Sequence, residues 1–100
     1  MTIAVTSPAE VKARLASGET IFLLDVREDD EVAEWTYPTY VHIPLGELGA
    51  RIGELPKDRQ ILCACRSGGR SMKAAALLDE AGYDVVNLDG GALAWMQDSE

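Results

Sequence analysis

Apolar residues occur in short, nearly continuous runs, separated by segments in which apolar positions recur at helical spacing. The runs over residues 21–26, 40–43, 60–64 and 84–88 predict four strands. The run over 21–26 is apolar almost throughout rather than alternating, which is typical of a central strand covered by helices on both faces.

Helices are predicted in the segments between these strands. Ser7, Pro8 and Glu10 are typical of a helix start, with Ser7 as the N-cap, Glu10 completing a capping box, and Gly18 as the stop. Further helical segments are expected at residues 31–35, 48–55, 70–81 and 93–96. This alternation predicts an α/β fold with a mainly parallel sheet and right-handed crossovers, whose ligand site lies beyond the carboxyl ends of the strands.

Composition narrows the possible partners. The 100 residues are 47% apolar and 26% charged, so we expect one globular domain over residues 1–100. Nine basic against 17 acidic residues give a net charge of −8, which argues against nucleic acid and anionic membranes as partners. Any anion site must therefore be local.

Location is predicted from what the chain lacks. No apolar run reaches the roughly 20 residues that span a bilayer, and the first residues have neither a basic start nor an apolar signal core. We therefore expect a cytoplasmic protein. Its two cysteines are too few for a secreted disulfide framework, and serve in packing, in metal binding or as reactive thiols.

One loop carries the most specific chemical signal. It lies between the strand at 60–64 and the helix at 70–81, and reads Cys65, Arg66, Ser67, Gly68, Gly69, Arg70 and Ser71. The glycines let several N–H groups point at one spot, and a helix start adds about half a positive charge, so the loop is expected to bind anions.

Within this loop, Cys65 is a candidate nucleophile. The N–H groups, together with Arg66 or Arg70, are expected to stabilise its thiolate at neutral pH. The alternatives are that Cys65 is a small buried apolar residue and that the arginines are solvated surface charges.

Four motifs in order resemble the rhodanese-like sulfurtransferases in their single-domain form, over nearly the whole chain. They are Leu24 to Arg27, His42 to Leu45, the loop from Cys65 to Ser71, and Asn87 to Gly91 with Ala94 and Trp95. The resemblance implies a central parallel sheet of five strands flanked by helices. It also implies that Cys65 accepts a sulfane sulfur and that residues 66–70 surround it.

The implied reaction is sulfur transfer through a persulfide. The donor is thiosulfate or a persulfide, the acceptor is cyanide, a small thiol or a thioredoxin-like protein, and neither a metal nor an organic cofactor is required. Arg70 follows Cys65 after four intervening residues, whereas related phosphatases have a loop one residue longer. The shorter loop favours sulfur transfer over the phosphatase or arsenate reductase chemistry of the same fold. A sulfur carrier or a non-catalytic module that recognises a protein partner is the remaining alternative.

Charged residues flank the end of the first central strand. Asp25 is expected to accept hydrogen bonds from the loop backbone or from an arginine, and Arg27 to close an ion pair at the rim of the site. The alternative is a surface pair worth under about 1 kcal/mol. The acidic run over residues 28–31 is expected to be a solvated face that discourages highly anionic substrates.

The segment over residues 35–41 departs from the family pattern. Its aromatic residues Trp35, Tyr37 and Tyr40 are expected either to line the rim of the site or to pack against the sheet edge. Cys63 is expected to be a buried structural thiol, because a Cys63–Cys65 disulfide would close a very tight ring. His42 is expected to be neutral and hydrogen-bonded near the sheet end rather than to be a zinc ligand.

Overall fold

Five parallel strands form the centre of the molecule. The computed structural model describes residues 2–98. The inner strands are β2 (Phe22–Asp25), β4 (Ile61–Ala64) and β5 (Val85–Leu88), and the edge strands are β1 (Val5–Thr6) and β3 (Val41–His42). The order across the sheet is β1-β5-β4-β2-β3, and every pair of neighbours is parallel. β4 therefore lies in the middle of the sheet.

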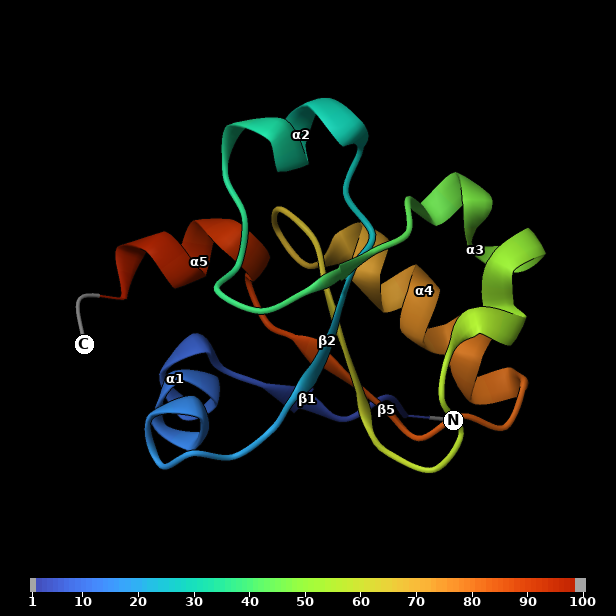
Figure 1. Cartoon of the computed structure of the whole chain (residues 1–100), viewed down its shortest axis with the longest axis horizontal. Helices are drawn as coiled ribbons and strands as arrows, with labels where there is room; N and C mark the ends of the chain where they lie inside the picture. The colour runs from blue at the N-terminus through green and yellow to red at the C-terminus, as the bar shows by residue number, and fades with distance from the viewer. Residues whose placement is uncertain (1, 99–100) are drawn as a thin grey trace.

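Helices cover both faces of this sheet (Figure 1). On one face lie α1 (Pro8–Ala16) and α5 (Gly91–Gln97), and on the other lie α3 (Leu45–Arg51), the 3-10 turn η1 (Ile52–Glu54) and α4 (Gly69–Glu80). Each face has its own apolar cluster. Val11, Leu23, Leu62, Leu88 and Trp95 belong to the first, and Leu24, Leu48, Ile61, Ala75 and Leu78 to the second.

The remaining helix, α2 (Asp29–Glu34), covers neither face. It follows β2 and lies beyond the carboxyl end of that strand (Figure 1). The loop that begins at Cys65 follows the carboxyl end of β4. This end lies beside the carboxyl end of β2, since Asp25 of β2 is paired with Ala64 of β4. The fold thus brings the acidic segment after β2 next to the loop after β4.

The predicted α/β architecture is confirmed, with local differences at the boundaries of several elements. The edge strand β1 was not predicted from the apolar pattern, because two residues are too few to show a repeat. Ser7 does cap α1 by accepting from the Glu10 N–H, but the Glu10 carboxylate accepts from the Thr6 hydroxyl, so the predicted capping box is only half formed. α2 begins at Asp29, before the expected start at residue 31.

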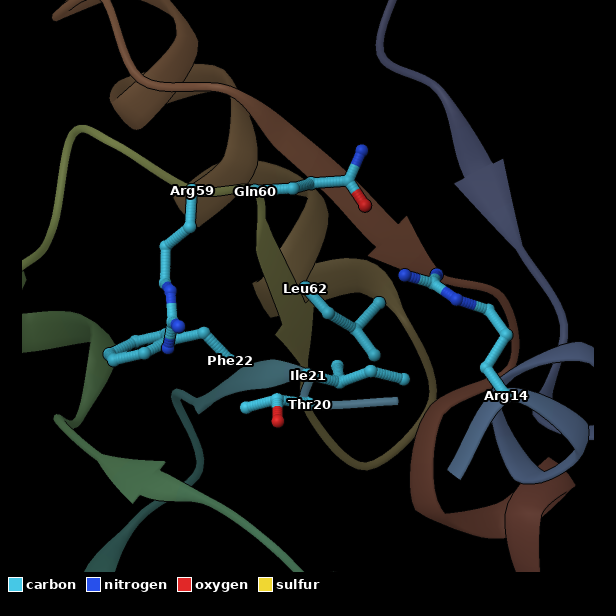
Figure 2. A pocket seen from close by; sticks show the side chains of 7 residues that line it. All are labelled: Arg14, Thr20, Ile21, Phe22, Arg59, Gln60 and Leu62. Carbon is cyan, nitrogen blue, oxygen red and sulfur yellow. The ribbon is translucent and has the colours of Figure 1, made fainter. Parts of the chain in front are cut away.

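A cavity of about 160 Å³ opens at the opposite end of the strands from Cys65, at the amino ends of β2 and β4 (Figure 2). Its lining consists of Arg14, Thr20, Ile21, Phe22, Arg59, Gln60 and Leu62. The cavity is therefore separate from the loop at Cys65. No helix within residues 2–98 is long and apolar enough to cross a membrane.

Candidate active site

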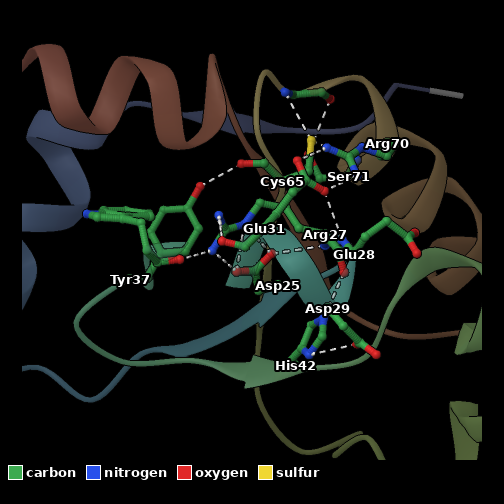
Figure 3. A network of polar contacts seen from close by, with 12 residues as sticks. Asp25, Arg27, Glu28, Asp29, Glu31, Tyr37, His42, Cys65, Arg70 and Ser71 are labelled. Carbon is green, nitrogen blue, oxygen red and sulfur yellow. Dashed lines mark hydrogen bonds and ion pairs between the residues drawn. The ribbon is translucent and has the colours of Figure 1, made fainter. Parts of the chain in front are cut away.

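The sulfur of Cys65 lies in a cradle of hydrogen-bond donors (Figure 3). The backbone N–H groups of Gly68 and Ser71 donate to Sγ at 3.1 and 3.3 Å, and the Ser71 hydroxyl lies 3.3 Å from it. Cys65 itself is only 1% exposed. A buried sulfur with this many donors is placed to carry a negative charge.

Two opposing effects set the pKa of the Cys65 thiol. Burial raises the pKa, but hydrogen bonds from the Ser71 hydroxyl and from the N–H groups of Ser71, Gly68 and Ser67 lower it by more. The net result is a pKa below the usual 9.0. The predicted stabilisation by loop N–H groups is therefore present, but no arginine donates to the sulfur among the residues that the structure describes.

Gly68 makes the cradle possible. It is the N-cap of α4, and its φ of +105° lies in the left-handed region, where a residue with a Cβ is strained. Its carbonyl oxygen accepts from the N–H of Met72 and from the Asn87 amide, and it accepts from the Ser71 hydroxyl while that hydroxyl itself accepts from the Cys65 thiol. These bonds fix the turn that aims the following N–H groups at Sγ.

The loop is also fastened from α5. The N–H of Ala92 donates to the Cys65 carbonyl oxygen at 2.9 Å, and the N–H of Leu93 donates to the Arg66 carbonyl oxygen at 3.0 Å. Gly91, with φ of +56°, permits this close approach, because a Cβ there would lie 2.5 Å from the Cys65 oxygen. The first residues of α5 thus hold the backbone of the loop in place.

Arg70 is paired with a carboxylate that the sequence did not single out. Its Nη1 and Nη2 atoms donate to Oε1 and Oε2 of Glu31 at 2.6 and 2.8 Å. The expectation that the run over residues 28–31 is merely a solvated face is wrong for Glu31, which is half-buried against the loop. The side chain of Arg66, by contrast, is exposed, and within residues 2–98 its guanidinium makes no hydrogen bond or ion pair.

Asp25 and Arg27 form a buried pair rather than an ion pair at the rim. Asp25 is fully buried and Arg27 is 3% exposed. The Arg27 guanidinium donates to both Asp25 oxygens at 2.7 to 3.0 Å, and the Arg27 N–H donates to Oδ1 at 3.0 Å. Arg27 also donates to the carbonyl oxygens of Glu31, within α2, and of Trp35, the C-cap of that helix, which ties the pair to α2. The alternative of a weak surface pair is therefore excluded.

The aromatic segment after α2 contributes one residue to the loop. Tyr37 is 1% exposed, packs edge-on against Trp35 and Trp95, and donates its hydroxyl to the Cys65 carbonyl oxygen at 2.8 Å. Of the two expectations for this segment, Tyr37 therefore fulfils that of packing, whereas Tyr40 is exposed. The aromatic side chain of Tyr37 indicated a buried ring, but no pattern in the sequence indicated its hydrogen bond to Cys65.

Cys63 and His42 have structural roles. Cys63 is a buried free thiol, and burial raises its pKa to about 12. His42 Nε2 donates to the Arg27 carbonyl oxygen at 2.7 Å, which matches the expected hydrogen-bonded histidine near the sheet end. Within residues 2–98, no group of three or more His, Cys, Asp or Glu side chains is placed to hold a metal ion.

Comparison with known proteins identifies the family. A family model described as a rhodanese-like domain matches residues 7–98. The chain is 43% identical over 95 residues to the Bacillus subtilis (strain 168) protein named "Putative sulfurtransferase YtwF", with coverage of 95% of this chain and 92% of that protein. It is 42% identical over 83 residues to a protein of Allochromatium vinosum named "Sulfurtransferase", with coverage of 82% and 78%.

A solved structure agrees with this similarity. The crystal structure of a rhodanese-like domain protein from Staphylococcus aureus matches with a TM-score of 0.88 at 29% identity, and the match covers 94% of this chain and 91% of that one. The fold, the family model and the relatives named as sulfurtransferases agree, and the kind of chemistry they support is sulfur transfer. This chain belongs to the rhodanese-like family.

Proposed function

We propose that the chain is a rhodanese-type sulfurtransferase in which Cys65 carries a sulfane sulfur from thiosulfate or a persulfide donor to a thiol or cyanide. The observation that carries the proposal is the cradle of donors, at 3.1 to 3.3 Å, around the buried Cys65 sulfur. Residues 1–100 would act as one domain. A reducing, cytoplasmic setting belongs to the proposal, because the chemistry needs Cys65 as a free thiol.

In the first step, the Cys65 thiolate attacks the outer sulfur of the donor. With thiosulfate, a new S–S bond to Sγ forms, the sulfur–sulfur bond of thiosulfate breaks, and sulfite leaves with the bonding electron pair. The products are a Cys65 persulfide with one negative charge and a sulfite with two, so charge balances. The lowered pKa of Cys65 increases the fraction of the thiol that is present as the attacking thiolate.

The loop would then hold the persulfide anion. The first N–H groups of a helix lack acceptors within the helix, and those of Gly69 and Arg70 occupy this place in α4. They are candidates to donate to the outer sulfur, in addition to the groups that already bond Sγ. The side chains of Arg66 and Ser67, which are exposed, would lie at the entrance to this site.

In the second step, an acceptor thiolate or cyanide attacks the outer sulfur. The S–S bond to Sγ breaks, the Cys65 thiolate returns, and the acceptor leaves as a persulfide or thiocyanate. Because one product leaves before the second substrate reacts, we expect ping-pong kinetics. The thiol acceptor is a small thiol or a thioredoxin-like protein. Relatives named as sulfurtransferases support both half-reactions as a class.

The test is the intact mass of the protein after thiosulfate treatment under non-reducing conditions. We expect the wild-type protein to gain the mass of one sulfur atom and to lose it on addition of cyanide. Cys63→Ser, which leaves the cradle intact, should behave as wild type, and Cys65→Ser should gain nothing. If Cys65→Ser still carried and passed on sulfur, or if wild type gained none from thiosulfate or an alkyl persulfide, the proposal would be overturned.

A further inference from the structure

The cationic groups around Cys65 are largely neutralised by carboxylates. The buried Arg27 is paired with Asp25, and Arg70 is paired with Glu31. Of the three arginines near the sulfur, Arg66 alone has no carboxylate partner within residues 2–98. An approaching anion therefore meets less positive charge than the sequence of the loop suggests.

The partner of Arg70 is held firmly from its own helix. Oε1 of Glu31 accepts from Arg70 at 2.6 Å and also from the Glu28 N–H at 2.9 Å, as the N3 residue of the α2 capping box. The hydrogen bond from Arg70 is the main cause that lowers the pKa of Glu31 to about 2, so the carboxylate is charged at neutral pH. The bidentate geometry fixes the direction of the guanidinium.

More negative charge surrounds this pair. Glu28, the N-cap of α2, attracts the charge of Arg70 through space. Asp29 and Asp30 follow it as exposed residues of the first turn of α2. Figure 3 shows Glu28 and Asp29 beside the network. The helix that supplies Glu31 therefore makes the approach to the loop acidic rather than basic.

We propose that Glu31 determines donor specificity by holding Arg70 away from the substrate, so that the site favours singly charged persulfides of thiols over doubly charged thiosulfate. This inference rests on the sulfurtransferase function proposed above. With a persulfide donor, the Cys65 thiolate attacks the outer sulfur, the donor S–S bond breaks, and a thiolate leaves, so two negative charges are present before and after. No oxidant or reductant is required.

The physical reason is the product of the charges. The thiolate repels thiosulfate about twice as strongly as a persulfide anion at the same distance, because Coulomb energy scales with both charges. A free guanidinium would offset this repulsion more for the dianion. Pairing Arg70 with Glu31 removes that offset and leaves the less charged donor at an advantage.

The test compares the rate at which Cys65 gains sulfur from thiosulfate and from cysteine persulfide, each measured by rapid quench and intact mass with no acceptor present. Glu31→Gln should raise the rate with thiosulfate, relative to that with cysteine persulfide, by about five-fold. The matched control is Glu34→Gln, which removes the same charge from an exposed position of α2. It should change the ratio by less than about two-fold.

Two further measurements separate a specificity role from a structural one. In the variant Glu31→Gln/Arg70→Gln, the gain with thiosulfate should disappear, because it requires the released guanidinium. In the wild type, raising the salt concentration should shift the ratio toward thiosulfate, because screening reduces the larger repulsion more. This second measurement needs no variant and so stands even if Glu31→Gln fails to fold.

The outcomes are distinct. If Glu31→Gln slows both donors equally, or if Glu34→Gln shifts the ratio as much, Glu31 has no specific role and the inference is overturned. A salt-independent ratio in the wild type would also overturn it. If neither donor loads the wild type at all, it is the proposed function that fails.

Discussion

The Tyr37 hydroxyl donates to the Cys65 carbonyl oxygen at 2.8 Å, although the two residues are 28 positions apart in the chain. This bond links the segment between α2 and β3 to the loop that holds the sulfur. The same carbonyl oxygen also accepts from the Ala92 N–H of α5. The backbone of Cys65 is therefore restrained from two sides.

We expect Tyr37→Phe to lower the free energy of unfolding by about 1 kcal/mol, because it removes one buried hydrogen bond and leaves the bond from Ala92 in place. Urea denaturation measures this change. The control is Tyr40→Phe, at an exposed position, which should change stability by less than about 0.5 kcal/mol. Equal effects from the two variants would show that the bond to Cys65 contributes nothing.

The reactivity of Cys65 should depend on the Ser71 hydroxyl. Ser71→Ala should raise the pKa of the thiol toward 9.0, because it removes a hydrogen bond that favours the thiolate, and should slow alkylation at neutral pH by about ten-fold. The pH profile of iodoacetamide alkylation measures both. Ser67→Ala is the control, since Ser67 contributes through its backbone N–H, and should move the profile less.

The same pKa shift predicts how stability depends on pH. Because the folded-state pKa of Cys65 lies below the unfolded value of 9.0, the folded protein binds fewer protons between the two values. The free energy of unfolding should therefore gain a contribution as the pH rises through that range and lose it as the pH falls through the lowered pKa. Cys65→Ser should abolish this contribution, and an unchanged pH dependence would contradict the prediction.

Breaking the buried pair of Asp25 and Arg27 should cost far more than breaking an exposed one. Asp25→Asn should lower the free energy of unfolding by about 3 kcal/mol, because Arg27 would keep its charge in the interior without a carboxylate. The matched control is Glu19→Gln, which breaks the exposed pair with Arg14 and should cost under about 1 kcal/mol. Similar losses in denaturant unfolding would contradict this difference.

Two glycines should respond in opposite directions to an added methyl group. Gly91→Ala should destabilise the protein by more than about 2 kcal/mol, since its Cβ would meet the backbone of Cys65 and Arg66 at 2.5 to 2.7 Å with φ positive. Gly49→Ala, in α3 with open space around the position, should stabilise by about 0.5 kcal/mol. Thermal melting of the two variants provides the measurement, and a tolerated Gly91→Ala would refute the close approach.

Much of the fold could be predicted from the sequence, because its information is local. The apolar runs of β2, β4 and β5 and the capping residue Ser7 identify their elements within a few residues. β1 could not be identified in this way. Its two residues become a strand only because they pair with β5, more than 80 positions later.

The site was predictable only in part, for the same reason. The glycines and the cysteine of the loop predict the cradle of N–H groups around the sulfur, since the geometry of this cradle arises within one short segment. The partner of Arg70 lies 39 positions away, and nothing in the acidic run distinguishes Glu31 from its neighbours until the fold brings α2 to the loop. Likewise, the burial of Arg27 follows from its contacts with Glu31, Trp35 and Tyr37, which its own place in the sequence does not indicate.

The two hydrogen bonds that the Cys65 carbonyl oxygen accepts, from Tyr37 and from Ala92, decide whether the loop can be transferred to another protein. Grafted onto another strand and helix, residues 65–71 would lose both restraints, the hydrogen bond from Asn87 to Gly68 and the close approach of Gly91. A designer who wishes to reproduce this thiol must therefore copy three segments of the chain, because the reactive loop is a product of the whole architecture.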